Sequence, residues 1–344
     1  MIGEGDNAPG FAEHWASQLG ASVRSLERLR GGINNRVFRC GDGNQHWVIK
    51  GYAPAQPGQR DRMQAEVDFL RFAAQAAPGF TPTLIQADPE RRCVVLEHLE
   101  GEAFPEGLPP SEGAVGEAVE FFRQLNAEPR LAQLSIQLDA AEGFLSLREH
   151  LGNVRQRLEG MGCAHLEAAL RPQAETMLQQ LHAVLAHTEE STNRLIDQGI
   201  VPDAISPEER CVSPSDFGFH NAIRTQAGIQ FIDFEFAGWD DPAKALVDFI
   251  FQPRVPVPGE PSALFTALHP FQRNNVDIRY AALKPVLRVK WLCIILAILR
   301  PERLKQMLIV SPEINPSRLI YARLRSASSY LNVNLEGTES SRMA

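Results

Sequence analysis

Polar and apolar residues alternate along several short segments of the first hundred residues, which is the pattern of strands that bury one face. The alternation flanks a glycine-containing segment at 30–34 and returns at 46–50, while residues 93–97 form a nearly continuous apolar run. Residues 62–74 place apolar side chains at helical spacing, and 11–29 indicate a short helix followed by a lead-in strand. These patterns predict a small sheet with accompanying helices.

The remainder of the chain is dominated by helical spacing of apolar residues. The predicted helices cover about residues 114–125, 145–159, 172–198 and 275–299. Ser111 is a typical N-cap for the first of them, and Gly199 is a typical stop for the third. The Gly- and Pro-rich segment 101–110 marks the expected boundary between the two parts. We predict an N-terminal lobe at 1–101, a helical C-terminal lobe at 102–335 and a disordered polar tail at 336–344.

One segment, from 213 to 248, concentrates polar residues of a kind that binds cations. Asp216 and Asn221 lie five residues apart in a loop rich in Gly, Ser and Pro. A β-hairpin is predicted to follow, because two apolar runs flank a turn at 225–228, and the second run leads to Asp233. Carboxylate and amide oxygens are ligands that Mg²⁺ prefers, and the remaining carboxylate is a candidate general base. The alternative is that Asp216 and Asn221 only form turns and that Asp233 is a solvated strand end.

The spacing of these three residues resembles the catalytic centre of the aminoglycoside phosphotransferase and choline kinase group of small-molecule kinases. Members of that group, like protein kinases, carry a His-x-Asp-x-x-x-x-Asn motif followed by an Asp at the end of the next strand. Asp216, Asn221 and Asp233 match this motif in type and spacing. Pro214 stands where the group has its His, which mainly braces the loop. The departure therefore concerns the bracing of the loop more than the chemistry.

The resemblance implies an α+β fold of the bilobal protein-kinase-like type, with a small antiparallel-sheet N-lobe and a mainly helical C-lobe. In such a fold Lys50 holds the α- and β-phosphates of ATP, and Glu66 on the following helix fixes the lysine. Asp68 lies on the wrong side of that helix and serves as an internal control. A glycine hairpin allows backbone N–H groups to approach phosphates. The residues assigned to the nucleotide are Gly31, Gly32, Asn34, Val37, Val48, Lys50, Glu66, Glu97, Leu99 and Ile232.

Two of these assignments have simpler alternatives on the sequence alone. A Gly-rich segment between strands is most often a plain hairpin, and a lysine at a strand end most often points into water. The order of the parts, which is a glycine hairpin, a strand lysine and a helix with an acid, favours the nucleotide. Val37, Val48 and Ile232 are assigned to the faces of the base. The Glu97 carbonyl and the Leu99 N–H are assigned to its edge.

Catalysis of phosphoryl transfer depends mostly on positioning the reacting groups and on placing cations beside them, because charge develops on the oxygens of the transferred phosphoryl group. The resemblance assigns Asp216 as the base that accepts the proton of the acceptor hydroxyl. It assigns Asn221 and Asp233 as ligands of a Mg²⁺ ion that bridges the phosphates. Glu235 is a candidate ligand of a second metal, since a strand would place it on the same face as Asp233, and a solvent-facing acid is the equal alternative. Asp248, in the helix that follows, is interpreted as structural.

Composition and net charge limit which classes of partner the protein binds and which cellular compartment it occupies. The net charge of −8 argues against a nucleic-acid surface, and neither a nucleic acid nor a membrane is expected as a partner. Five scattered cysteines without zinc-ligand or redox spacing predict reduced thiols in a cytoplasmic protein. The N-terminus lacks the features of a signal peptide, and the longest apolar run, 291–299, is too short to cross a bilayer. We expect surface or capping roles, without a shared metal site, for His150, His165, His182 and His187.

The acceptor is expected to be a small molecule. Only eight residues separate Asp233 from Pro242, which leaves no room for a segment that docks a peptide strand. A hydroxyl of a sugar, amino sugar, aminoglycoside or amino alcohol is the predicted target. An inactive nucleotide-binding pseudokinase of the same fold is the alternative, motivated by Pro214, and an all-helical scaffold with accidental matches is a third. The sequence leaves open the acceptor, the choice between ATP and GTP, and the oligomeric state.

Overall fold

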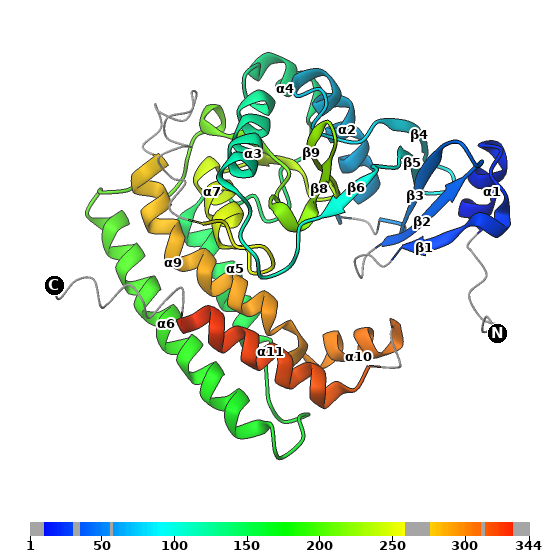
Figure 1. Ribbon diagram of the computed structural model, residues 1–344. Coiled ribbons are helices and arrows are strands. Elements are labelled where there is room, and N and C mark those ends of the chain that lie inside the picture. Colours follow the sequence, from blue (N-terminus) through cyan, green and yellow to red (C-terminus); the bar gives the residue numbers. More distant parts are fainter. Residues whose placement is uncertain (1–9, 30–34, 56–57, 259–275, 311–313, 333–344) are drawn as a thin grey trace. The chain divides into compact units, whose positions relative to one another are not determined.

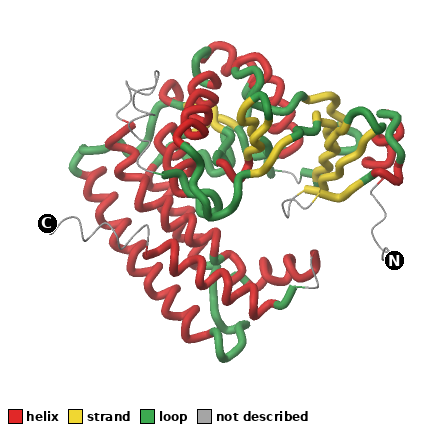
Figure 2. The backbone as a smooth tube through the Cα atoms, viewed as in Figure 1, coloured by secondary structure: helices red, strands yellow, loops and turns green. Residues whose placement is uncertain are grey.

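The computed structural model describes residues 10–29, 35–55, 58–258, 276–310 and 314–332. The chain forms two compact units (Figures 1 and 2). Unit 1 comprises Met1–Ala141 and Val212–Trp239, and unit 2 comprises Glu142–Cys211 and Asp240–Ala344. Unit 1 extends past residue 101 because β6 (Gly101–Ala103) pairs with β8 (Ala222–Thr225). The lobes expected at 1–101 and 102–335 stay a prediction, and the tail at 336–344 lies outside the described residues.

A five-stranded antiparallel sheet in the order β1-β2-β3-β5-β4 forms the first part of unit 1. Its strands are β1 (Glu27–Leu29), β2 (Asn35–Gly41), β3 (His46–Tyr52), β4 (Leu84–Asp88) and β5 (Cys93–Glu97). Helix α1 (Gly10–Gln18) and the short turn η1 (Val23–Ser25) precede them. Trp47 and Ile49 share a buried core with Ala16 of α1. Since side chains alternate along β3, Lys50 and Tyr52 project from the opposite face.

Helix α2 (Arg62–Ala76) packs beside β4 and β5 and confirms the helix predicted at 62–74. Its N-cap is Asp61, whose carboxylate accepts a hydrogen bond of 3.1 Å from the backbone N–H of Gln64. The two terminal nitrogens of Arg92 donate hydrogen bonds of 2.7 and 2.8 Å to the two oxygens of the same carboxylate, which fixes the start of the helix. The helix buries Val67 and Leu70, as its spacing predicts.

The remainder of unit 1 carries the predicted hairpin. β6, β8 and β9 (Gly228–Phe231) form a three-stranded sheet, and β7 (Cys211–Ser213) pairs with β10 (Gly238–Asp240). Helices α3 (Glu112–Leu125), which Ser111 caps as predicted, and α4 (Pro129–Ser135) complete it. Phe121 of α3 stacks on Phe231 of β9, with ring centroids 4.9 Å apart. Phe217 packs against both rings, so an aromatic core joins α3 to the loop that contains Asp216.

Gly238 is a position where the backbone of unit 1 comes too close for a side chain. The N–H of Trp239 donates to the Leu138 carbonyl at 3.0 Å, and the N–H of Ala140 donates to the Trp239 carbonyl at 2.7 Å. A Cβ on Gly238 would overlap the Leu138 carbonyl oxygen.

We expect Gly238→Ala to lower the free energy of unfolding by about 1–3 kcal/mol, as overpacking does. Urea unfolding measures this change. Gly116→Ala on the exposed face of α3 is the matched control, because a Cβ there meets nothing within 4 Å. That substitution should stabilise by about 0.5–1 kcal/mol, since alanine costs less backbone entropy in a helix. Equal effects of the two substitutions would refute the overlap.

Unit 2 is helical. Its helices are α5 (Leu147–Glu159), α6 (Arg171–Asp197), α7 (Pro242–Phe251), α9 (Val276–Ile295), α10 (Pro301–Val310) and α11 (Pro316–Leu331), with short turns η2 (Pro207–Glu209) and η5 (Ala297–Leu299). Apolar residues of α5, α6, α9 and α11 form one core. Figure 1 labels these helices. The helices predicted at 145–159 and 172–198 are confirmed, and Gly199 ends the second with φ of 69°. Among the described residues, no helix is both long and apolar enough for a bilayer crossing.

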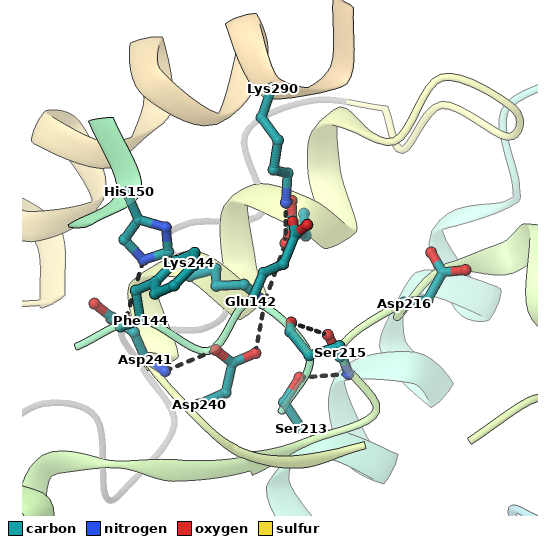
Figure 3. A network of polar contacts seen from close by, with 12 residues as sticks. Glu142, Phe144, His150, Ser213, Ser215, Asp216, Asp240, Asp241, Lys244 and Lys290 are labelled. Carbon is teal, nitrogen blue, oxygen red and sulfur yellow. Dashed lines mark hydrogen bonds and ion pairs between the residues drawn. The ribbon is translucent and has the colours of Figure 1, made fainter. Parts of the chain in front are cut away.

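A chain of buried ion pairs lies in unit 2 (Figure 3). Lys244 of α7 binds Asp240 at 2.8 Å and Asp248 at 3.3 Å, and Lys290 of α9 binds Asp248 at 2.5 and 2.8 Å. Burial alone would lower the pKa of Lys244, but the two carboxylates outweigh it and raise that pKa. Removing one partner of such a set would leave an uncompensated buried charge. These contacts agree with the interpretation of Asp248 as structural.

His150 departs from the surface or capping position that we expected. It is buried, and its Nε2 lies 3.1 Å from the Phe144 carbonyl oxygen (Figure 3). Burial, reinforced by nearby Lys244 and Lys290, lowers the pKa of His150 well below its ordinary value. The imidazole is therefore neutral in the folded protein and donates to the carbonyl. The other three histidines, at 165, 182 and 187, are exposed as predicted.

The buried His150 should make stability depend on pH. In the unfolded chain its imidazole binds a proton near pH 6.5, whereas the folded protein resists that proton until a lower pH. Falling pH in this window therefore favours the unfolded state, by up to about 1.4 kcal/mol per pH unit. The measurement is the difference in free energy of unfolding between wild type and His150→Gln at about pH 7.5, 6.5 and 5.5. The difference should shrink as pH falls, and a constant difference would contradict the buried neutral imidazole.

Candidate active site

Lys50, Glu66 and Asp233 meet within unit 1. The Lys50 Nζ lies 2.6 Å from the Glu66 Oε2 and 2.5 Å from the Asp233 Oδ1. The lysine comes from β3, the glutamate from the face of α2 that packs toward the sheet, and the aspartate from the segment after β9. The structure thus brings together three side chains that the sequence assigned to the phosphates and the metal. Asp68 instead accepts a bond from Gln64 on its own helix, as expected of the control.

Lys50 and Glu66 form an ion pair in a buried setting. Lys50 is 6% exposed and Glu66 is 1% exposed. Burial alone would lower the pKa of Lys50, but the charges of Glu66 and Asp233 outweigh it and raise that pKa. Burial raises the pKa of Glu66, and the attraction of Lys50 opposes this rise. Tyr52 donates a hydrogen bond of 2.5 Å to the same glutamate oxygen, which fixes the carboxylate toward the lysine.

Asp216 and Asn221 are joined to each other and to the segment that carries Asp233. The Asn221 Nδ2 donates to the Asp216 carbonyl oxygen at 3.0 Å and to its Oδ2 at 3.2 Å. The N–H of Ile232 donates to the Asn221 carbonyl at 2.9 Å. Asn221 therefore lies beside the residue that directly precedes Asp233. These bonds link the base, the amide and the second carboxylate of the predicted motif.

His220 is a site residue that the sequence reasoning missed. Its Nε2 lies 3.0 Å from the Asp216 Oδ1, and its side chain is only 6% exposed. A histidine at this place was visible directly before Asn221, but the group's motif has its His before the Asp, so nothing singled it out. The structure shows that Asp216 has an imidazole partner even though Pro214 occupies the motif position.

Two residues of the candidate site, one in the loop that contains Asp216 and one after β9, have an uncommon backbone conformation. Ser215 and Asp233 have φ of 66° and 68°, in the left-handed region that non-glycine residues rarely adopt. The Ser215 N–H donates to the Ser213 Oγ at 2.9 Å, and the Ser215 Oγ donates to the Ala141 carbonyl at 2.9 Å (Figure 3). These bonds brace the loop around Pro214. Strained backbone of this kind gathers at functional sites.

Glu235 does not lie in the strand that we expected. β9 ends at Phe231, and Glu235 lies in a turn at 235–236 before β10, so the prediction that a strand gives it a common face with Asp233 was wrong. Glu235 is buried, and the Asn35 Nδ2 donates to its Oε2 at 2.5 Å. The turn forms because a left-handed residue, Asp233, cannot continue an extended strand. A second-metal role for Glu235 stays an untested prediction.

Two contacts that the sequence did not indicate hold this turn. Arg60 donates from Nε to the Glu235 carbonyl at 2.9 Å and from its terminal nitrogens to the carbonyls of Asp139 and Ala237. Phe234 stacks on Phe69 of α2, with ring centroids 4.5 Å apart. The same helix thus contacts Lys50 through Glu66 and the residue after Asp233 through Phe69.

The residues present fit a hard divalent cation. The Asn221 amide nitrogen is used on Asp216, which leaves its side-chain oxygen as the ligand atom. The Asp233 side chain is 37% exposed, so its carboxylate is accessible although one oxygen contacts Lys50. An amide oxygen and a carboxylate on adjacent backbone match the oxygen ligands of Mg²⁺, which usually keeps several waters as well.

The structure describes some of the residues that the sequence assigned to nucleotide binding. Val37 lies opposite Lys50 in the register of β2 and β3, so it shares a face with Lys50 and Val48. Glu97 uses its carboxylate on the N–H and hydroxyl of Thr83, at 3.1 and 2.7 Å. Ile232 is half-buried. The contacts of Glu97, Leu99 and Ile232 with a base stay predictions, and Gly31, Gly32 and Asn34 lie outside the described residues.

Solved structures show the same fold. The choline kinase of Cryptosporidium parvum matches with a TM-score of 0.54 and 13% identity, covering 96% of this chain and 94% of that chain. A spectinomycin phosphotransferase, solved with ADP and spectinomycin, matches with a TM-score of 0.53 and 12% identity, covering 89% of this chain and 92% of that chain. A thermostable mutant of the aminoglycoside phosphotransferase APH(4)-Ia matches with a TM-score of 0.51 and 16% identity, covering 91% of this chain and 98% of that chain. The expected α+β protein-kinase-like fold is confirmed.

Sequence comparison identifies the family. None of the curated proteins matches the chain. The family described as the phosphotransferase enzyme family matches residues 25–269, which include Lys50, Glu66, Asp216, Asn221 and Asp233. This range is more than two thirds of the chain and includes both the five-stranded sheet and the hairpin of β8 and β9. The protein therefore belongs to the phosphotransferase enzyme family.

Proposed function

We propose that the protein transfers the γ-phosphoryl group of ATP to a hydroxyl of a small molecule. The observation that carries this proposal is the contact of Lys50 with both Glu66 and Asp233. It joins the phosphate-binding lysine to the residue proposed to hold the metal. Asp216 and Asn221 are linked to the same segment by hydrogen bonds. Together these groups supply the positioning and charge that phosphoryl transfer needs.

Each side chain of the candidate active site has a proposed role in phosphoryl transfer. Lys50, fixed by Glu66, holds the α- and β-phosphates. Asp216 accepts the proton of the acceptor hydroxyl and orients its oxygen in line with the γ-phosphorus. Asn221 and Asp233 hold Mg²⁺, which supplies neutralisation of the phosphate charge when it is bound.

The acceptor class rests on the short segment after the metal ligand. The eight residues between Asp233 and Pro242 form a turn and a short strand, and they leave no peptide-docking segment. A hydroxyl of a sugar, amino sugar, aminoglycoside or amino alcohol is the proposed target. Choline kinases and aminoglycoside phosphotransferases share this fold. The net charge of −8 favours neutral or cationic acceptors over anionic ones.

We further propose a cytoplasmic location and no nucleic-acid partner. All five cysteines are buried and unpaired, which suits a reducing compartment. The acidic net charge opposes binding to a phosphate backbone.

A catalytically weak or inactive nucleotide-binding protein of the same fold is the second candidate. Pro214 favours it, because the loop lacks the bracing histidine of the motif. The hydrogen bonds of Ser215 and the contact of His220 with Asp216 count against it, since the loop is braced by other means.

Two successive measurements test the proposed function. Melting with ATP and Mg²⁺ should show stabilisation, worth roughly 2.7 kcal/mol when the ligand is at a hundred times its dissociation constant. ADP release should then be screened over sugars, amino alcohols and aminoglycosides, with Asp68→Ala as a variant expected to retain activity. No stabilisation would reject nucleotide binding. Stabilisation without acceptor-dependent ADP release would favour the inactive alternative.

His220 is proposed as a positioning residue for Asp216. We expect His220→Ala to lower kcat about 10- to 100-fold with little change in KM for ATP, since a hydrogen bond to a charged group is worth roughly 1.5–3 kcal/mol. His220→Gln, which retains a side-chain N–H donor, should recover part of the loss. Steady-state kinetics over a pH range measure both variants. If His220→Ala instead raised only the KM for ATP, the imidazole would not act through Asp216.

A further inference from the structure

A second group of potential ligands lies at one end of the five-stranded sheet, apart from the residues assigned to catalysis. His46 begins β3, and His98 and Glu100 follow the end of β5. The two strands pair there, and the N–H of His98 lies 3.4 Å from the His46 carbonyl oxygen, which sets the histidines side by side. Among the described residues, this is a set of imidazole and carboxylate atoms that all lie within 4.8 Å of one another.

The distances within the group match those of a metal site. The Glu100 Oε1 lies 3.1 Å from the His98 Nδ1 and 3.4 Å from the His46 Nδ1. Two ligands bound tetrahedrally to Zn²⁺ at about 2.0–2.1 Å are separated by about 3.3 Å. Two edges of the coordination polyhedron are therefore already at the required length. The third edge, between the ring nitrogens of the two histidines, is no longer than 4.8 Å, and a metal would require it to shorten to about 3.3 Å.

The surroundings leave room for the rings and for an ion. Gly41 lies opposite His46 in the register of β2 and β3, and a Cβ on Gly41 would overlap the His46 ring. Glycine at this place therefore allows the ring position that the site needs. The side chains of His46 and Glu100 are 39% and 75% exposed, so an ion in solution reaches them. Arg39 is a nearby cation, and its Nη1 is paired with the Glu27 carboxylate at 3.8 Å.

We propose that His46, His98 and Glu100 form a binding site for a divalent transition-metal ion of the Zn²⁺ class. Two imidazoles with one carboxylate suit Zn²⁺ and its neighbours better than Mg²⁺, which prefers oxygen ligands alone. Three protein ligands leave a fourth position for water. The bound ion joins the start of β3 to the segment after β5, and this segment contains Leu99.

Calorimetric titration of the full chain, carrying no added histidines, with Zn²⁺ tests this proposal. Excess Mg²⁺ is present throughout to occupy sites that prefer hard ligands. Wild type should bind one Zn²⁺ at micromolar protein, and Co²⁺ bound in its place should show the visible absorption of a tetrahedral complex. His46→Gln, His98→Gln and Glu100→Gln should each weaken Zn²⁺ binding by at least the ~10–100-fold that loss of even an outer-shell partner costs.

Matched variants distinguish this site from other histidines. His165→Gln and His182→Gln replace exposed histidines of unit 2 and should leave the Zn²⁺ affinity unchanged. Arg39→Gln should tighten binding, since it removes a nearby positive charge. If His98→Gln does not fold, the exposed His46 and Glu100 variants carry the test. The proposal is overturned if wild type binds no Zn²⁺, or if the His46 and Glu100 variants bind it as wild type does.

Discussion

Replacing Asp216 by Ala is expected to lower turnover by about 10²- to 10⁴-fold, which is the usual worth of a general base. The affinity for ATP should survive. Lys50, Glu66 and Asp233 bind one another without help from Asp216. Steady-state kinetics on an acceptor found by the ADP-release screen measure kcat, and calorimetry measures the dissociation constant of ATP.

The conservative variant separates proton acceptance from packing. Asp216→Asn keeps the size of the side chain and a hydrogen-bonding oxygen for Asn221, but an amide does not accept the hydroxyl proton. It should lose nearly as much turnover as Asp216→Ala. If Asp216→Asn retained wild-type turnover, Asp216 would serve only to hold the loop.

Replacing Asp233 by Ala is expected to remove the dependence of nucleotide binding on Mg²⁺. Asp233 is the carboxylate among the two residues assigned to the metal, and Asn221 alone offers one neutral oxygen. Lys50 keeps Glu66 as its partner in this variant, at the 2.6 Å seen in the structure, so residual binding without metal is expected. Electron paramagnetic resonance of Mn²⁺ used in place of Mg²⁺ counts the ions bound with the nucleotide.

The control for Asp233→Ala is the replacement of an acidic residue that lies outside the candidate site. Asp68→Ala on α2 takes away the same charge, and Asp68 contacts only Gln64 among the hydrogen bonds described. This variant should bind Mn²⁺ with nucleotide as wild type does. If Asp233→Ala bound Mn²⁺ and nucleotide equally well, the metal assignment would fail.

Local patterns were sufficient to predict most elements of the fold. Alternation predicted β3, and a nearly continuous apolar run predicted β5. Helical spacing predicted α2, α3, α5 and α6, and Ser111 and Gly199 bounded helices as expected. The turn at 225–228 also formed where the apolar runs predicted it. These features depend on interactions between near neighbours, which a single sequence shows directly.

The pairing of Lys50 with Glu66 was predictable for a different reason. Period two in β3 and the helical spacing of α2 fix which side chain faces the other element. The order of parts then selects the partner, and Asp68 on the other side of the helix was correctly set aside.

Contacts set by backbone geometry could not be predicted. The left-handed φ of Asp233 interrupts the extended backbone after β9 and precedes the turn that contains Glu235. An aspartate carries no signal for that conformation as strong as a glycine would. Arg60 reaches three carbonyls far along the chain. His150 is buried because an α5 residue at that turn faces inward, although its type suggested the surface.

Calorimetric titration of the wild-type chain with a non-hydrolysable ATP analogue, with and without Mg²⁺, tests most directly whether Lys50, Asn221 and Asp233 bind a metal–triphosphate complex. We expect one site per chain, with a higher affinity when Mg²⁺ is present. Absence of binding, or binding of equal strength without Mg²⁺, would contradict it.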